Sequence, residues 1–200
     1  MSITKKTHKP RVRRSSQASR DNILSAAEAL LLEKGPQALK LTDVAEQAGI
    51  AHATVLHHFG SIADVQTALM ERMIRQLVGQ ILDAHRRGED TGHRTEAGMQ
   101  AMFDAFEAKG AARLAAWLEL TGESRRLTMV RDAVRSVIAS RAERDGTSPE
   151  VAEDQSLVGI VLAMGVGLFG RSLAELLGRP AGTARQLAQD LLRGMMVPKR

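Results

Sequence analysis

The segment from Leu41 to Ser61, LTDVAEQAGIAHATVLHHFGS, constrains the fold of this chain more than any other. It predicts two short helices, about 41–48 and 52–58, joined at Gly49, where a residue without a Cβ takes the left-handed conformation at little cost. Small Ala45 suits two helices that cross steeply over a three- or four-residue turn. The residues expected to face inward are Val44, Ala45 and Ala48 in the first helix, and Val55 and Phe59 in the second.

Such a helix pair is typical of proteins that place the second helix in the major groove of DNA, although any helical hairpin needs a similar alanine and glycine. The side chains expected to face DNA are Thr42 before the turn and His52, Ala53, Thr54, His57 and His58 after it. The second helix has no Arg, Lys, Asn or Gln, so the strong bidentate pairings with guanine and adenine are missing. We therefore expect modest direct readout of bases.

Residues 20–69, a quarter of the chain, resemble the DNA-binding domain of the tetracycline-repressor-type (TetR) family of transcriptional regulators. The matching residues are Ile23, Leu24, Ala26, Ala27, Leu30, Glu33, Lys34, Gly35, Asp43, Val44, Ala45, Glu46, Ala48, Gly49, Thr54, His58, Phe59 and Ser61. The resemblance implies a homodimeric repressor that a small-molecule effector releases from a near-palindromic operator. It does not extend to the other three quarters of the chain.

Three positions depart from that family's pattern. Leu56 stands where the family usually has a tyrosine, and Ile62 where it usually has a lysine, both common phosphate contacts. Lys40 stands where the family prefers a threonine that caps the second helix of the domain. The phosphate contacts must therefore come partly from elsewhere.

The basic charge of the chain is concentrated at its N-terminus. The sequence holds 28 Lys and Arg against 23 Asp and Glu, a net charge of +5, and residues 1–20 contain basic residues but no acidic one. We interpret residues 1–18 as a disordered basic arm that neutralises phosphates or enters the minor groove. A merely solvated tail or an expression remnant is the alternative. The basic residues expected to contact DNA are Arg11, Arg13, Arg14, Arg20 and Lys40.

Glycines and capping residues divide the remainder into about nine helices with almost no strand signal, which predicts an all-α fold. We expect a helix-turn-helix domain over residues 19–66 and a helical effector-binding and dimerisation domain over residues 67–200. Ser61 with Asp64 should open a long helix. A polar loop should follow at 86–94, with the next helix starting at Thr95. Ser148-Pro149 should open a helix that continues to Leu177.

The segment from Leu157 to Leu177 is apolar nearly all round, with glycines that allow close helix approach. Either it is the central helix of the chain's own core, or a second subunit covers part of it; the resemblance favours a dimer. The expected interface residues are Leu157, Ile160, Val161, Met164, Leu168, Phe169, Leu173, Leu187 and Leu191. The longest apolar run, Leu157–Gly170, is too short to span a bilayer.

A second set of apolar residues at helical spacing follows the long helix. If the family habit holds, they wall an effector pocket; otherwise they are plain core. They are Met99, Met102, Phe103, Phe106, Trp117, Leu118, Leu127 and Val130. The sequence does not identify the effector.

The sequence contains no cysteine, phosphate-binding loop or secretory signal. His52, His57 and His58 lack the spacing of a shared metal site on one helix. We therefore predict a cytoplasmic, nucleoid-associated DNA-binding regulator without catalytic residues, cofactor, metal or membrane contact. Two alternatives stay open: an architectural DNA-binding protein without an effector, and a helical protein–protein adaptor.

Overall fold

Every element of the structure is helical, as the apolar spacing predicts. The structure is a computed structural model that describes residues 16–86 and 91–196, so Arg11, Arg13 and Arg14 lie outside the described residues. Within these ranges no β-strand occurs, and nine helices are present if α8, η4 and α9 are counted as one. The predicted all-α fold is confirmed.

The N-terminal domain is built around the predicted helix pair. Its elements are α1 (Ser16–Lys34), the 3-10 turn η1 (Pro36–Ala38), α2 (Leu41–Gln47) and α3 (His52–Phe59). Each helix contributes fully buried apolar side chains to one core, including Ile23, Val44 and Val55. Because α1 already includes residues 16–18, the expected arm of residues 1–18 is too long at its C-terminal end.

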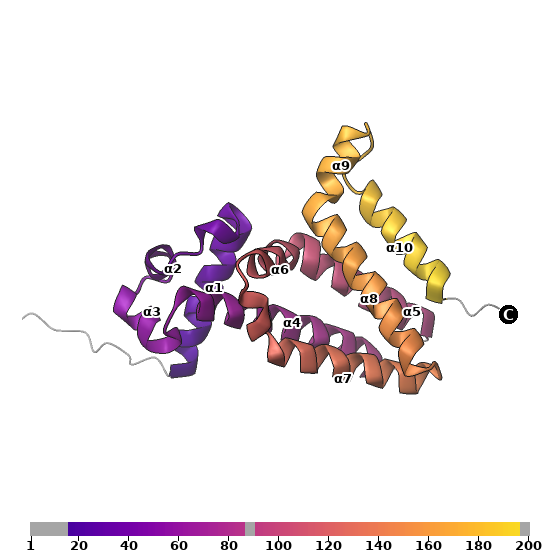
Figure 1. The fold of residues 1–200 in the computed structure, drawn as a ribbon, viewed down its shortest axis with the longest axis horizontal. Helices are drawn as coiled ribbons and strands as arrows, with labels where there is room; N and C mark the ends of the chain where they lie inside the picture. Colours follow the sequence, from indigo (N-terminus) through magenta and orange to yellow (C-terminus); the bar gives the residue numbers. More distant parts are fainter. Residues whose placement is uncertain (1–15, 87–90, 197–200) are drawn as a thin grey trace, which may run out of the picture.

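Helix α4 (Ile62–Arg86) links this domain to the rest of the chain (Figure 1). The amide N–H of Asp64 donates to Ser61 Oγ at 3.1 Å, which confirms the predicted cap. Its buried stripe includes Val65 and Leu69 in the N-terminal domain and Leu77 further along. The predicted domain boundary at residues 66–67 therefore falls inside one continuous helix.

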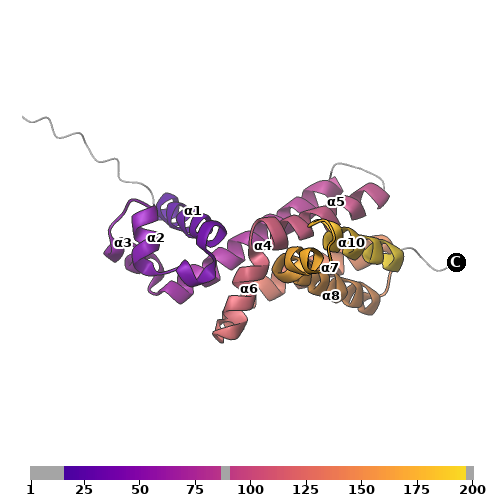
Figure 2. The same cartoon turned by 90° about the horizontal axis from the view of Figure 1, so that it is seen from above.

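The C-terminal helices pack around the far half of α4, on the opposite side of the molecule from α2 and α3 (Figure 2). They are α5 (Thr91–Phe103), η2 (Asp104–Ala108), α6 (Ala111–Leu120), η3 (Glu123–Arg126), α7 (Thr128–Asp145), α8 (Pro149–Gly165), η4 (Val166–Gly170), α9 (Arg171–Leu176) and α10 (Thr183–Met196). The helix predicted to start at Thr95 begins at Thr91, so the polar loop is shorter than expected. Ser148 accepts from the Val151 amide and caps α8 as predicted.

Two π-helical turns, η2 and η4, pack against each other. Gly167 lies at their contact, where an added Cβ would stand 2.7 Å from the Phe106 carbonyl oxygen and 2.8 Å from Ala112 Cβ. Gly159 lies against Met102 and Leu192 of its own chain. These glycines therefore serve close helix approach within the subunit.

Helix α10 is fastened to α5 and η2 by charged side chains. Arg185 contacts Asp104 at 2.7 Å and Glu107 at 3.2 Å, and Arg193 donates to both carboxylate oxygens of Glu96 at 2.9 Å each. The hydrogen bonds from Arg193 hold the pKa of Glu96 below its usual value. These contacts hold α10 alongside α5.

The Glu96–Arg193 contact predicts a pH-dependent contribution to stability. Because the pKa of Glu96 is lower in the folded state, the contribution is present above the unfolded-state pKa and is lost as pH falls through the folded-state value. Both side chains are about half exposed, so solvent screening keeps the effect small. Thermal unfolding of Glu96→Gln should show a slightly lower midpoint than the parent at about pH 7, and the difference should shrink as pH falls through the folded-state pKa of Glu96. A difference that does not change with pH would contradict this, and Glu119→Gln, at an exposed position of α6, is the control.

Candidate nucleic-acid interface and ligand pocket

The turn between α2 and α3 fixes the angle at which α3 leaves the core. Gly49 has φ +64°, the conformation for which glycine is expected, and its amide donates to Glu46 O at 3.0 Å. The Ile50 amide donates to Ala45 O at 3.0 Å, and Asn22 of α1 donates to Ala48 O at 2.9 Å. The turn is thus held by α1 as well as by its own backbone.

Helix α3 buries one side and exposes the other. Val55 and Phe59 face the core, whereas His52, Ala53 and His57 are exposed. Thr54 and His58 are half-buried. The exposed side therefore has the shape and polarity of a helix that can lie in a groove, with two imidazoles and one methyl group available to base edges.

Leu56 is exposed on the same helix, with 37% of its surface accessible. In the sequence, this position stands out only because it lacks the tyrosine that the family usually has. Its exposure makes it an apolar contact that could pack against sugars or thymine methyl groups at the groove edge.

The Arg20 side chain already makes contacts within the fold. Its guanidinium donates to the His58 carbonyl oxygen and lies 4.1 Å from the centroid of the Phe59 ring. This arrangement closes the C-terminal end of α3, where a positive charge is favourable. The structure thus assigns Arg20 a role in positioning α3, and its expected contact with DNA stays a prediction.

Lys40 and Thr42 lie at the start of α2. Both are exposed, and Thr42 Oγ1 donates to Asp43 Oδ1 at 3.1 Å. Lys40 precedes α2 in extended conformation and makes no side-chain cap. Both residues are therefore accessible to a phosphate.

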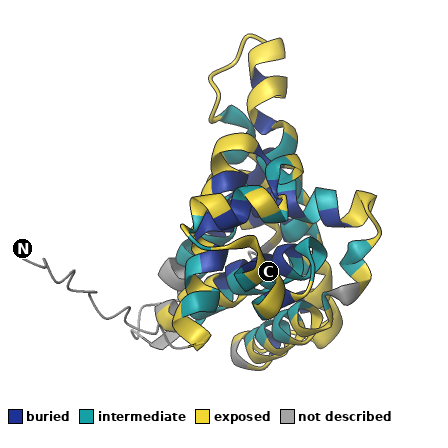
Figure 3. Cartoon of the chain, turned by 90° about the vertical axis from the view of Figure 1, so that its left-hand side faces the viewer, coloured by how far each residue is buried: buried dark blue, intermediate teal, exposed yellow. Residues whose placement is uncertain are grey.

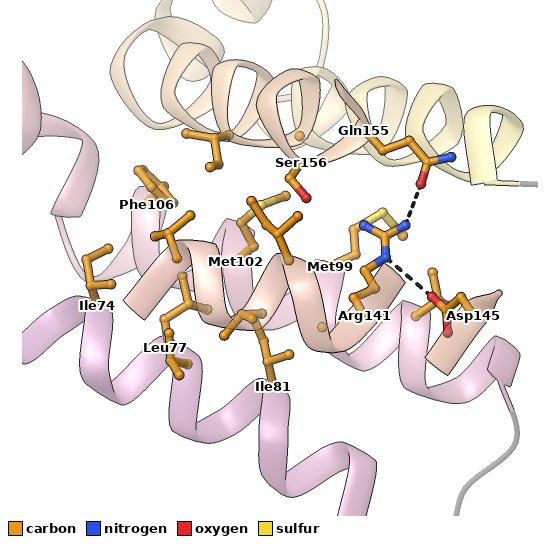
Figure 4. Close-up of a pocket in the computed structure, with 18 residues that line it drawn as sticks. Ile74, Leu77, Ile81, Met99, Met102, Phe106, Arg141, Asp145, Gln155 and Ser156 are labelled. Carbon is orange, nitrogen blue, oxygen red and sulfur yellow. Dashed lines mark hydrogen bonds and ion pairs between the residues drawn. The ribbon is translucent and has the colours of Figure 1, made fainter. Parts of the chain in front are cut away.

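The C-terminal domain contains a cavity of about 170 Å³ between α4, α5, α7 and α8 (Figure 4). Most of its lining is aliphatic, with Phe106 as the single aromatic side chain among the lining residues. Three of the residues expected to wall a pocket, Met99, Met102 and Phe106, line it. The other five do not: Phe103 and Leu118 are fully buried, and Trp117, Leu127 and Val130 are half-buried outside the lining.

One end of the cavity is polar. Arg141 Nη2 donates to Gln155 Oε1 at 2.7 Å, and Arg141 Nε lies 3.5 Å from Asp145 Oδ2. Gln155 Nε2 in turn donates to the Met195 carbonyl oxygen of α10 at 3.2 Å. The sequence did not predict that these polar residues line the cavity. The only sign of it is that Arg141 continues the helical spacing of the apolar residues Val134, Val137 and Ile138.

The described residues give no sign of a metal centre: no group of three or more His, Asp or Glu side chains in 16–86 and 91–196 is placed to hold an ion. His57 and His58 face each other edge to face, with ring centroids 5.4 Å apart. The two rings therefore pack as neighbours.

Helices α8, α9 and α10 expose an apolar face. Residues Leu157, Val161, Gly165, Phe169 and Leu173 repeat every four positions and are all exposed, as are Leu187 and Leu191 on α10. Figure 3 shows the end of this face standing out from the body of the molecule as mostly exposed ribbon. The other three residues predicted for the interface, Ile160, Met164 and Leu168, are half-buried against the core. Ile160 also lines the cavity.

The helix through this face is longer than its apolar run suggested. Pro149–Leu176 forms one helical segment of 28 residues, which by length and composition alone could cross a membrane. The expectation of a segment too short for a bilayer is therefore wrong, because the helix continues on both sides of Leu157–Gly170. It packs against α7 and α10 of the same chain, and 28% of its most apolar window is buried.

Comparisons with known proteins agree with this architecture. Residues 23–69 match the family described as bacterial regulatory proteins, tetR family. The chain is 28% identical over 88 residues to the HTH-type transcriptional activator FasR of Mycolicibacterium smegmatis, covering 44% of this chain and 40% of that protein. It is 27% identical over 93 residues to the HTH-type transcriptional repressor KstR2 of Rhodococcus jostii, covering 46% of each. The matches thus span less than half the length of these relatives.

The fold extends further than the sequence similarity. The crystal structure of a TetR transcriptional regulator from Legionella pneumophila superposes with a TM-score of 0.66 at 16% identity, covering 94% of this chain and 100% of that one. The C-terminal helices therefore share an arrangement with that protein although their residues differ.

Proposed function

We propose that the chain is a dimeric, sequence-specific DNA-binding transcriptional regulator of the cytoplasm, because residues 23–69 match the family described as bacterial regulatory proteins, tetR family. In this proposal it represses transcription from a near-palindromic operator until a small-molecule effector releases it. The observation that carries the proposal is α3, whose one side is buried while its other side offers His52, Ala53 and His57 to a groove.

A second copy of the chain is the proposed cover of the apolar face on α8, α9 and α10. Two helices with aligned rows of exposed leucine, valine and phenylalanine favour a four-helix contact around a two-fold axis. Such a dimer places two recognition helices ~34–36 Å apart, which matches one turn of DNA. Burial in this interface also gives the long apolar helix a partner other than a membrane.

The cavity is the proposed effector site. Helix α4 lines it through Ile74, Leu77 and Ile81 and is fastened to α1 by Arg72, whose guanidinium donates to Leu24 O at 2.8 Å and pairs with Glu28. A ligand that binds one position of α4 more tightly would shift the population between arrangements of the two DNA-binding domains. Operator affinity would fall by the coupling free energy.

Selection of bound sequences from random duplex DNA tests the proposal. Recovery of an inverted repeat with half-sites one helical turn apart is the expected result. Uniform binding to all duplexes would instead identify an architectural DNA-binding protein, and absence of salt-dependent binding would favour a protein–protein adaptor. A promoter reporter then separates repression from activation, since the relatives include one of each.

The basic N-terminal residues are proposed to supply phosphate contacts that α3 lacks. Deleting residues 2–15, which leaves α1 whole, should weaken operator binding and flatten its dependence on salt. Each lost phosphate contact reduces the slope of log K against log salt by ~0.9. The measurement is a salt titration of binding by fluorescence anisotropy. An unchanged slope would show that these residues are only a solvated tail.

A further inference from the structure

The two ends of the cavity differ in polarity, so an asymmetric ligand would bind in one orientation. Figure 4 shows Ile74 and Phe106 at one end and Arg141, Asp145 and Gln155 at the other. Met99 and Met102 lie between them, and methionine adapts its shape readily to an apolar ligand. A molecule that fits both ends has an apolar body and one polar head.

At the polar end, the Arg141 guanidinium has one well-placed acceptor, Gln155, and a second, Asp145, that lies too far away for a good hydrogen bond. The Arg141 side chain is 24% exposed, and its Nε lies 3.5 Å from Asp145 Oδ2, beyond the 2.7–3.2 Å range of a normal N–H···O bond. An arginine fork holds a carboxylate best through two parallel hydrogen bonds. A carboxylate that entered along the cavity could therefore make a better contact than Asp145 makes.

The size and lining of the cavity limit the apolar body. Its volume of about 170 Å³ is close to the ~150 Å³ of an engineered apolar cavity that binds benzene. The lining is mainly aliphatic, including Leu77, Ile81 and Ile160. These features favour a short or medium aliphatic chain.

We propose that the cavity binds an aliphatic monocarboxylate, with the chain between α4, α5 and α8 and the carboxylate on the Arg141 guanidinium. A cationic amphiphile would meet Arg141 at the same end and is disfavoured. The inference rests on the proposed function for its regulatory meaning, but ligand binding itself requires no DNA.

Hydrogen bonds also connect the polar end of the cavity to α10, which carries part of the exposed apolar face. Gln155 accepts from Arg141 and donates to the Met195 carbonyl oxygen of α10, the helix that carries Leu187 and Leu191. A carboxylate on Arg141 competes with Gln155 for the guanidinium. Occupancy of the polar end therefore changes a contact that holds α10.

Isothermal titration calorimetry of the full chain without DNA tests the proposal with hexanoate, decanoate, decanol, methyl decanoate and decylamine, the uncharged compounds below their solubility limits and the ionic ones below their micelle concentrations. Decanoate should bind, and the uncharged and cationic analogues should bind at least ~10-fold more weakly, because they lose a charge-assisted hydrogen bond. Equal affinity for decanoate and decanol would overturn the role of the head group. Absence of binding by both hexanoate and decanoate would overturn the proposal itself.

Two variants at the polar end should act in opposite directions. Arg141→Gln should weaken decanoate binding ~10- to 100-fold, because one charged hydrogen-bonding partner is lost. Asp145→Asn should strengthen it by about 3- to 10-fold, because the competing negative charge is removed. Arg135→Gln, on an exposed side of the same helix, is the matched control and should change neither decanoate affinity nor melting temperature.

The reciprocal pair keeps the test valid if Arg141→Gln folds poorly. A weaker affinity in Asp145→Asn, or an unchanged affinity in a stably folded Arg141→Gln, would contradict the assignment of Arg141. Decanoate binding that persists in a chain without operator selectivity would uphold this inference and refute the regulatory function. An inverted repeat recovered without decanoate binding would do the reverse.

Discussion

If the proposed dimer forms through α8, α9 and α10, a Leu191→Glu substitution is expected to convert it into monomers and to remove tight operator binding. Leu191 is 62% exposed on α10, between Leu187 and Met195 on the same side of the helix. In a two-fold interface each substitution occurs twice, and each lost burial removes ~1.5–3 kcal/mol. The dimer dissociation constant should therefore rise by about 100- to 10,000-fold.

Sedimentation velocity at several protein concentrations measures this change directly. Gln186→Glu adds the same charge to an exposed position outside that apolar row and is the matched control. A dimer that survives Leu191→Glu at low micromolar concentration would place the subunit contact elsewhere. The parent chain must also form a dimer without detergent, and a requirement for lipid or detergent would point to a membrane as the partner of this face.

Gly167→Val is expected to destabilise the folded chain by about 3 kcal/mol or more, because overpacking here displaces backbone as well as side chains. The first added carbon would already stand 2.7 Å from the Phe106 carbonyl oxygen, which cannot move without shifting the π turn η2. Urea unfolding followed by circular dichroism gives the free energy of unfolding.

Gly79→Val is the matched control for that experiment. Gly79 also lies inside a helix, α4, but an added Cβ there meets nothing within 4 Å. Its free energy of unfolding should change by no more than ~0.5 kcal/mol. Similar losses in both variants would mean that helix propensity, and not the contact between η2 and η4, determines the effect.

The DNA-binding domain could be predicted because its signals are local. Gly49, Ala45 and Val55 lie within eleven residues of one another, and a turn residue, a small residue and an apolar period together specify one helix pair. The partner of Arg20 could not be predicted in this way. Its hydrogen bond to His58 joins residues 38 positions apart, and only the packing of α1 on α3 brings them together.

The pocket was predicted less well because its walls come from helices that are far apart in the sequence. Apolar spacing places Met99, Met102, Phe103 and Phe106 on one side of a helix, but it does not tell which of them faces a cavity and which packs in the core. Met99, Met102 and Phe106 line the cavity, whereas Phe103 joins the core. The other walls come from α4, α7 and α8, and only tertiary packing brings these helices together. Arg141 was missed because an isolated arginine in an apolar row is usually a surface residue.

Helix α8 alone separates the cavity from the exposed apolar face. Ser156, Gly159 and Ile160 line the cavity, whereas Leu157 and Val161 face away from it. If the cavity is the effector site and the outer strip is the dimer interface, as proposed, substitutions on the inner strip after a gene duplication would let two copies diverge in the ligand they bind while the outer strip still allowed mixed dimers. We therefore expect recently duplicated relatives with this arrangement to interfere with one another until the outer strip also changes. Substitutions that prevent mixed dimers should then be found at positions equivalent to 157 and 161 rather than among the residues that line the cavity.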